Sequence, residues 1–142
     1  MKFESKIYLS YDDIDSMCRN LEEHVSALHP DLIVGIARGG CLPALHLSHA
    51  LSVPMKVIQW QTRDDKTEHI DRDIIKLIKN KKTVVFVDDI NDSGLTFKQI
   101  YRAYNGGVYV SMVERVGSDF NSDVRSIRFD DTRWIVFPWE KS

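Results

Sequence analysis

The sequence predicts an α/β protein in which helices flank a twisted parallel sheet. Short, almost wholly apolar runs alternate with segments whose apolar residues recur every three or four positions. That alternation is the pattern of buried parallel strands separated by amphipathic helices. The 142 residues and 16.4 kDa are the size of one domain, and no linker or internal repeat divides them. We therefore expect a single domain over residues 1–142.

The composition favours a self-folding globular protein and argues against several function classes. Hydrophobic residues make up 43% and charged residues 28%, which is far from the signature of a disordered chain. The formal charge of -2 argues against binding to nucleic acid through a basic face. No apolar run has signal-peptide or membrane length, so we expect a soluble, cytoplasmic protein that binds no membrane. Cys18 and Cys41 lack a disulfide or zinc spacing, in keeping with a reducing compartment.

Four elements are expected in the first half of the chain: a helix over 11–28, a strand over 32–37, a helix over 41–51 and a strand over 55–60. Ser10 and Asp13 resemble a capping box at the start of the first helix, and Pro30 ends it. The tripeptide Arg38-Gly39-Gly40 breaks the first strand. Pro43 is compatible with the second helix because it falls in the first turn.

The second half continues the alternation after a polar segment, residues 61–73, which is either a solvated connection or a mobile lid. We expect a helix over 71–80, a strand over 83–87, a helix over 95–105 and a strand over 108–113. Asp88 and Asp89 are expected to end the strand before them. Gly106-Gly107 supplies the stop of the last helix.

The stretch VVFVDDINDSGLT, residues 84–96, carries the clearest chemistry. Backbone amides of residues 93–96 at a helix N-terminus suit a phosphate monoester, and Gly94 permits close approach. Asp88 and Asp89 can accept hydrogen bonds from a sugar diol and carry a hydrated Mg²⁺ ion. A ribose 5-phosphate would satisfy both halves of the motif. The simpler alternative is that these aspartates only form a turn and a helix cap.

This stretch resembles the phosphoribosyl pyrophosphate (PRPP) motif of type I phosphoribosyltransferases: four apolar residues, two acids, two variable residues, then Asp-Thr/Ser-Gly-x-Thr. Upstream, IVGIARGGCLP, residues 33–43, resembles the pyrophosphate loop of the same family. The resemblance implies a strained, sometimes cis, Ala37–Arg38 peptide. It also implies that PRPP is bound by Arg38, Gly39, Asp88, Asp89, Ile90, Asn91, Asp92, Ser93, Gly94, Leu95 and Thr96.

A third segment, DDTRWIVFPWE at residues 130–140, resembles the C-terminal hood of the purine branch, near the xanthine-guanine and hypoxanthine-guanine enzymes. The resemblance implies that Trp134 stacks on the ring of a purine. It also implies that the backbone carbonyls of Trp134 and Ile135 accept hydrogen bonds from the amino group at the edge of the purine ring. The alternative is an amphipathic edge strand whose tryptophans fill core. Purine members use a lysine at the end of the preceding strand to bind the 6-oxo group. Here that strand ends in Glu114-Arg115, so Arg115 is the nearest equivalent.

The resemblance implies transfer of the 5-phosphoribosyl group from PRPP to N9 of guanine, xanthine or hypoxanthine, with Mg²⁺ carried at Asp89. Asp88 and Asp89 would stabilise charge at the anomeric carbon, and Asp92 would accept the proton of purine N7. Arg38 would bind pyrophosphate, assisted by Arg63 or Lys66 from the lid. A dimer or tetramer is expected. The alternatives are a nucleotide-sensing regulator of this fold and a phosphoribosyltransferase for another base.

Overall fold

The computed structural model describes residues 5–61 and 70–140, in which strands and helices alternate. The elements are β1 (Lys6–Tyr8), α1 (Tyr11–Ser26), β2 (Leu32–Ala37), α2 (Cys41–Leu51), β3 (Met55–Gln59), α3 (Arg72–Lys79), β4 (Val84–Asn91), α4 (Leu95–Tyr104), β5 (Val108–Arg115), β6 (Val124–Phe129) and β7 (Trp134–Val136). In this part of the chain no helix is long and apolar enough to cross a membrane.

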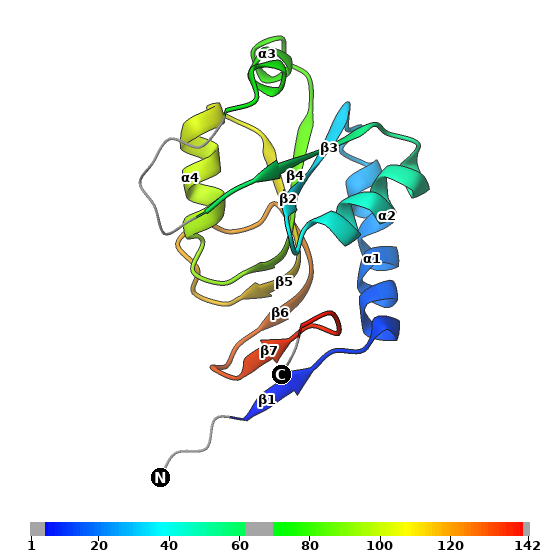
Figure 1. The fold of residues 1–142 in the computed structure, drawn as a ribbon, viewed down its shortest axis with the longest axis vertical. Coiled ribbons are helices and arrows are strands. Elements are labelled where there is room, and N and C mark those ends of the chain that lie inside the picture. Colours follow the sequence, from blue (N-terminus) through cyan, green and yellow to red (C-terminus); the bar gives the residue numbers. More distant parts are fainter. Residues whose placement is uncertain (1–4, 62–69, 141–142) are drawn as a thin grey trace.

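The main sheet of the described chain has five parallel strands in the order β3-β2-β4-β5-β6 (Figure 1). Alternating side chains of the central strands point to opposite faces: Val85 packs with α1 and α2, whereas Phe86 packs with α3 and α4. Both faces are covered, so the central strands are apolar almost throughout. This architecture confirms the predicted α/β class.

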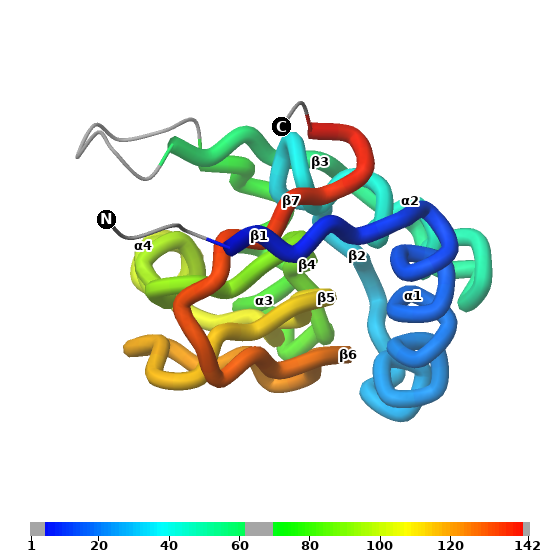
Figure 2. Tube along the Cα trace, turned by 90° about the horizontal axis from the view of Figure 1, so that it is seen from below, coloured from blue at the N-terminus to red at the C-terminus, as the bar shows by residue number. Residues whose placement is uncertain are grey.

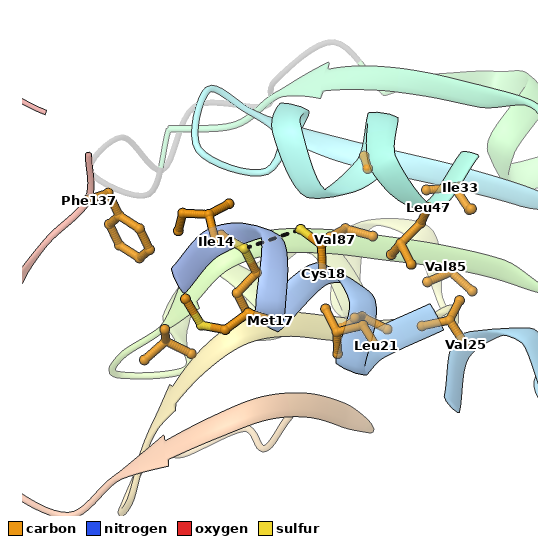
Figure 3. Close-up of a cluster of buried hydrophobic side chains, with 14 of the residues drawn as sticks. Ile14, Met17, Cys18, Leu21, Val25, Ile33, Leu47, Val85, Val87 and Phe137 are labelled. Atoms are coloured by element: carbon orange, nitrogen blue, oxygen red, sulfur yellow. Dashed lines mark hydrogen bonds between the residues drawn. The ribbon is translucent and has the colours of Figure 1, made fainter. Parts of the chain in front are cut away.

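The core between the sheet and helices α1 and α2 is built mainly from aliphatic and sulfur-containing side chains, together with the aromatic ring of Phe137 (Figure 3). The α1 side chains at spacings of three and four are all buried, and Cys18 lies beside Met112 with 3.9 Å between the sulfur atoms. The capping box predicted at Ser10 and Asp13 is present, with Ser10 N donating to Asp13 Oδ2 over 2.8 Å. The helix ends at Ser26, two residues before the predicted end at 28.

The opposite core combines aliphatic side chains with a cluster of aromatic rings. Phe86 stacks on Tyr109 with ring centroids 5.2 Å apart, and Phe97 and Tyr104 from α4 pack against the same pair. Helix α4 begins after Gly94 and ends at Tyr104, and Asn105 follows in a left-handed conformation, with φ 56°. The aromatic contacts fix α4, and with it the loop at its N-terminus, against β4 and β5.

Two short strands from opposite ends of the chain form a second parallel sheet, in which β1 pairs with β7. Seen from below in Figure 2, this pair crosses the carboxyl-terminal side of the main sheet. Leu9 N extends the pairing by donating to Val136 O over 2.9 Å. The pair lies where the resemblance places the hood.

Two strand predictions require correction. Asp88 and Asp89 do not end β4, which continues to Asn91 because Asp88 pairs with Ser111 and Asn91 with Glu114 of β5. Cross-strand pairing therefore outweighs the low strand propensity of aspartate. The sequence also predicts no strand over 124–129, although VRSIRF forms β6 at the edge of the sheet.

Candidate active site

The connection between β4 and α4 forms a loop with backbone amides at a helix N-terminus. Gly94 has φ 92°, and a side-chain carbon there would collide with the backbone of Phe120, so this position requires glycine. Ser93 Oγ accepts a hydrogen bond from Leu95 N over 3.2 Å. A cavity of about 220 Å³ lies along this loop and is lined by residues 88–97. We call residues 92–96 the phosphate loop.

The Arg38-Gly39-Gly40 turn lies directly against Val87 and Asp89 of β4. The Ala37–Arg38 peptide bond is cis, as the resemblance implies. A side-chain carbon at Gly39 would overlap the carboxylate of Asp89, and one at Gly40 would overlap the carbonyl of Val87. Only glycine therefore lets the turn approach β4 this closely, and the two motifs that are 50 residues apart in the sequence meet in space.

Asp88 and Asp89 are adjacent acids with unfavourable electrostatics. Burial raises the pKa of Asp88 well above its usual range, and the charge of Asp89 adds to the effect. Burial also raises the pKa of Asp89, and the charge of Glu140 adds to it, against hydrogen bonds that lower it. Asp89 N donates to Asp88 Oδ1 over 2.9 Å and Ile90 N donates to Asp89 Oδ1 over 2.7 Å, so each carboxyl is held by the backbone amide of the next residue.

These carboxyls fit a Mg²⁺ ion. Carboxylate oxygens are hard ligands, and a divalent cation would compensate the burial that raises the pKa of each carboxyl. Within residues 5–61 and 70–140, no group of three or more acidic, histidine or cysteine side chains could hold a metal by itself. Mg²⁺ is commonly held by one or two carboxylates together with substrate phosphates, which is the arrangement Asp88 and Asp89 can support.

A second cavity of about 210 Å³ adjoins the first, and the two share Asp89, Ile90 and Asp92 in their walls. Its other lining residues come from the end of β5 and from the C-terminal segment: Arg115, Trp134, Ile135, Phe137 and Glu140. Trp134 is 60% exposed, so it does not fill core, which excludes the alternative interpretation for this residue. Its exposed ring forms a wall of the cavity.

Arg115 makes two strong contacts beside this cavity. Nε donates to Asp92 Oδ1 over 2.6 Å, and Nη1 donates to the carbonyl oxygen of Asp131 over 2.6 Å. The guanidinium thus ties the start of the phosphate loop to the segment that precedes β7. The structure therefore gathers all four residues expected to bind the base, Asp92, Arg115, Trp134 and Ile135, around one cavity.

The sequence analysis did not single out Phe137 or Glu140. Glu140 Oε1 accepts a hydrogen bond from Phe137 N over 2.9 Å, which closes a turn, and Phe137 stacks on Trp139 with centroids 5.0 Å apart. The sequence does contain a signal for this turn, the ending Pro138-Trp139-Glu140, but the sequence alone does not indicate a role for the acid. Arg63 and Lys66, the expected lid residues, lie outside the described residues.

Comparisons with known proteins agree with this geometry. A family model described as "Phosphoribosyl transferase domain" matches residues 5–115. Xanthine-guanine phosphoribosyltransferase of Cereibacter sphaeroides is 25% identical over 148 residues, covering 96% of this chain and 88% of the relative. Hypoxanthine-guanine phosphoribosyltransferase of Saccharomyces cerevisiae is 27% identical over 118 residues, covering 68% and 53%. A solved purine phosphoribosyltransferase from Pyrococcus horikoshii is 32% identical, with a TM-score of 0.83 and coverage of 97% and 96%.

Proposed function

Because this chain belongs to the type I phosphoribosyltransferase family, we propose that it transfers the 5-phosphoribosyl group from PRPP to N9 of a 6-oxopurine, the reaction of purine salvage. The observation that carries this proposal is the pair of adjoining cavities that share Asp89, Ile90 and Asp92. One has the groups that suit a phosphorylated ribose, and the other has an aromatic wall and polar groups that suit a flat heterocycle. The reacting atoms would meet at the shared wall.

In this proposal PRPP lies along β4 with its 5-phosphate on the phosphate loop. Asp88 and Asp89 accept hydrogen bonds from the ribose hydroxyls, and their charge stabilises the oxocarbenium-like transition state more than the ground state. Arg38 and the amides after it face the departing pyrophosphate. Mg²⁺, when bound with PRPP at Asp89, supplies positive charge that neutralises the phosphate oxygens.

The base lies against Trp134, where stacking fixes the plane of the ring. The bond from the anomeric carbon to pyrophosphate breaks, the bond to N9 forms, and the proton of N7 passes to Asp92. Arg115 is engaged by Asp92 and Asp131 through Nε and Nη1, so Nη2 is the nitrogen that donates to the 6-oxo group. An amino group at that ring position would meet a donor, which disfavours adenine.

We also infer a cytoplasmic protein and a homo-oligomer, a dimer or tetramer. The two cysteines support the first inference because both are free thiols within the described chain. Sedimentation of the purified protein tests the second, since a species of 16.4 kDa at micromolar concentration would contradict it.

The function is tested with labelled free bases, PRPP and Mg²⁺. We expect nucleoside monophosphate and pyrophosphate with at least one of guanine, xanthine and hypoxanthine, and much slower turnover with adenine and orotate. A gel shift with RNA and DNA runs in parallel. Turnover of orotate or adenine in preference to the 6-oxopurines would contradict the substrate class, and a nucleic-acid shift without turnover would favour a regulator.

A further inference from the structure

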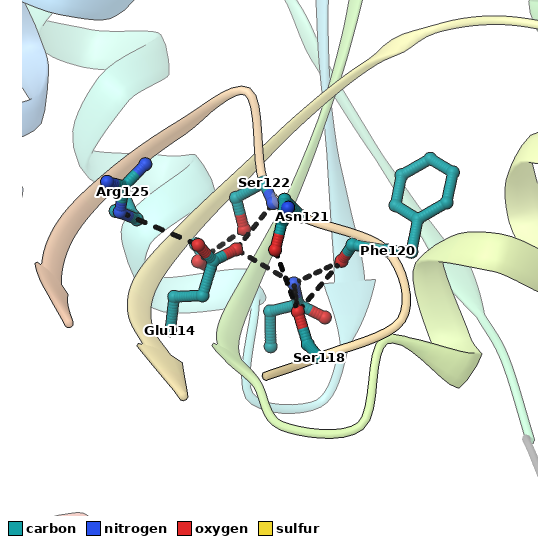
Figure 4. A network of polar contacts seen from close by, with 8 residues as sticks. Glu114, Ser118, Phe120, Asn121, Ser122 and Arg125 are labelled. Atoms are coloured by element: carbon teal, nitrogen blue, oxygen red, sulfur yellow. Dashed lines mark hydrogen bonds and ion pairs between the residues drawn. The ribbon is translucent and has the colours of Figure 1, made fainter. Parts of the chain in front are cut away.

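Glu114, at the carboxyl end of β5, is a carboxylate inside the protein. It is 1% exposed, and described residues surround it with donors (Figure 4). Oε2 accepts from Asn91 Nδ2 over 2.9 Å and from Ser122 N over 2.5 Å. Oε1 lies 3.5 Å from Arg125 Nε. The sequence analysis gave this residue no role, and it does not line either cavity.

Glu114 is held in its ionised form. Burial alone would raise its pKa, but the hydrogen bonds from Ser122 and Asn91 and the charge of Arg125 outweigh burial, so the net pKa is lowered. A buried carboxylate with this many partners is seldom the most stable choice, because well-packed apolar residues of similar size often serve stability as well or better. A role beyond core packing is therefore the more economical explanation.

The groups bound by Glu114 reach the phosphate loop. Asn91 is the last residue of β4, and its Nδ2 also donates to the carbonyl oxygen of Phe120 over 2.6 Å. Asp119 N donates to Ser93 O over 2.8 Å, inside the phosphate loop. Within residues 118–122, the backbone amides of Asp119 and Phe120 pack so closely behind Gly94 that no side chain fits between them. We call residues 118–122 the supporting segment.

We propose that Glu114 is a positioning residue that sets the conformation of the phosphate loop, acting through Asn91 and the supporting segment. One carboxylate oxygen binds both the residue that leads into the phosphate loop and the residue that ends the supporting segment, so the two backbones keep a fixed separation. The amides of residues 93–96 then point at one place, which is a condition for binding a phosphate monoester. The inference rests on the proposed function, because it assigns the loop a phosphate.

The test is Glu114→Gln. The carboxamide keeps the size of the side chain but has only one acceptor oxygen. Its NH₂ group cannot accept a hydrogen bond from Asn91 or Ser122, and it has no negative charge to attract Arg125. We expect the dissociation constant for ribose 5-phosphate and the KM for PRPP to rise about tenfold or more, because hydrogen bonds to a buried charge are lost. The KM for the purine base should change by less than about twofold. Hydrogen exchange at Asp119 and Ser122 should accelerate.

Asp31→Asn is the matched control. Asp31 Oδ2 also accepts a backbone hydrogen bond, from Thr83 N over 2.7 Å, but at the amino end of the sheet. This variant should leave ribose 5-phosphate binding and exchange in the supporting segment unchanged. Glu114→Asp, which keeps the charge and shortens the reach, replaces Glu114→Gln if that variant does not fold, and its KM for PRPP should rise in the same direction.

Two outcomes separate this inference from the proposed function. A folded Glu114→Gln enzyme that keeps the wild-type KM for PRPP and the wild-type exchange at Asp119 overturns the positioning role alone. An equal rise in the KM for PRPP and for the base would also overturn it, since that is the behaviour of general structural damage. Wild-type protein that neither binds ribose 5-phosphate nor turns over any base would instead overturn the proposed function.

Discussion

Asp92 stands at the shared wall of the two cavities, with one oxygen bound by Arg115. Asp92→Asn should retain the fold, because the amide has the same shape and its oxygen can still accept from Arg115. Turnover with guanine or hypoxanthine should fall by about 10² to 10⁴, the usual effect of losing a general base. Steady-state kinetics measure the loss, and Asp15→Asn on the exposed face of α1 serves as the control. Undiminished turnover would remove the proton acceptor role from Asp92.

Arg115 and Trp134 should contribute to base binding in different ways. Arg115→Ala should selectively weaken the binding of 6-oxopurines, because the 6-oxo group of the base loses its hydrogen-bond donor. Trp134→Ala should weaken the binding of all purines by about 1 to 3 kcal/mol, because stacking does not depend on whether ring position 6 carries an oxo or an amino group. Competition between hypoxanthine and adenine measures both effects. If Arg115→Ala leaves the ratio of the two affinities unchanged, recognition of the 6-oxo group belongs to another residue.

The aspartate pair should contribute less to the stability of the free enzyme at neutral pH than in acid. A carboxyl whose pKa is raised by folding contributes stability that is fully present below its unfolded pKa and is lost as the pH rises through the folded pKa. Asp88→Asn removes the ionisable group, so the free energy of unfolding no longer falls as the pH rises. The variant should therefore unfold about 2 to 4 °C higher at pH 7, which corresponds to a gain of roughly 1 kcal/mol in the free energy of unfolding.

The same variant should lose PRPP turnover, because the ribose hydroxyls lose a carboxylate. The gain in melting temperature should shrink at pH 4 and vanish below about pH 3, because the carboxyl is then protonated in the folded protein and, increasingly, in the unfolded chain, whose aspartate has its ordinary pKa of 3.8. Calorimetry at the two pH values makes the comparison. A variant less stable than wild type at pH 7 would contradict the electrostatic explanation.

At the scale of elements, the start of α1 links the hood to the main core. Ser10 follows β1 and caps α1, and Asp13 N donates to its Oγ over 3.1 Å. Ser10→Ala should lower the free energy of unfolding by about 1 kcal/mol, since it removes one capping bond. Thermal unfolding measures this, and turnover below the transition should be unchanged. A loss of turnover without a loss of stability would show that the cap acts on the site directly.

The elements that could be predicted are those whose signal is local. The apolar run at 32–37 and the helical spacing from Ile14 to Val25 need no distant partner to be recognised. The extension of β4 through Asp88 depends on Ser111 across the sheet. Strand β6 has alternating residues, but its edge position leaves it with polar side chains and no continuous apolar run.

The same distinction holds for the site. The phosphate loop and the Arg38 turn lie in contiguous motifs, so their residues could be named from the sequence. The contact between Gly39 and Asp89 and the link from Glu114 through Asn91 to Phe120 join segments that only the folded chain brings together. Their residue types are ordinary for turns and strand ends, so no pattern marks them.

For the whole molecule, the pairing of β1 with β7 has a consequence for protein synthesis. Lys6–Tyr8 are made before every strand of the main sheet, whereas their partner Trp134–Val136 is made after all of them. The strands of the main sheet and the phosphate loop all precede residue 130. A nascent chain therefore has every residue proposed to hold PRPP outside the exit tunnel before it has a wall against which to hold a base. The order of translation is therefore also the order in which the two proposed halves of the site are completed.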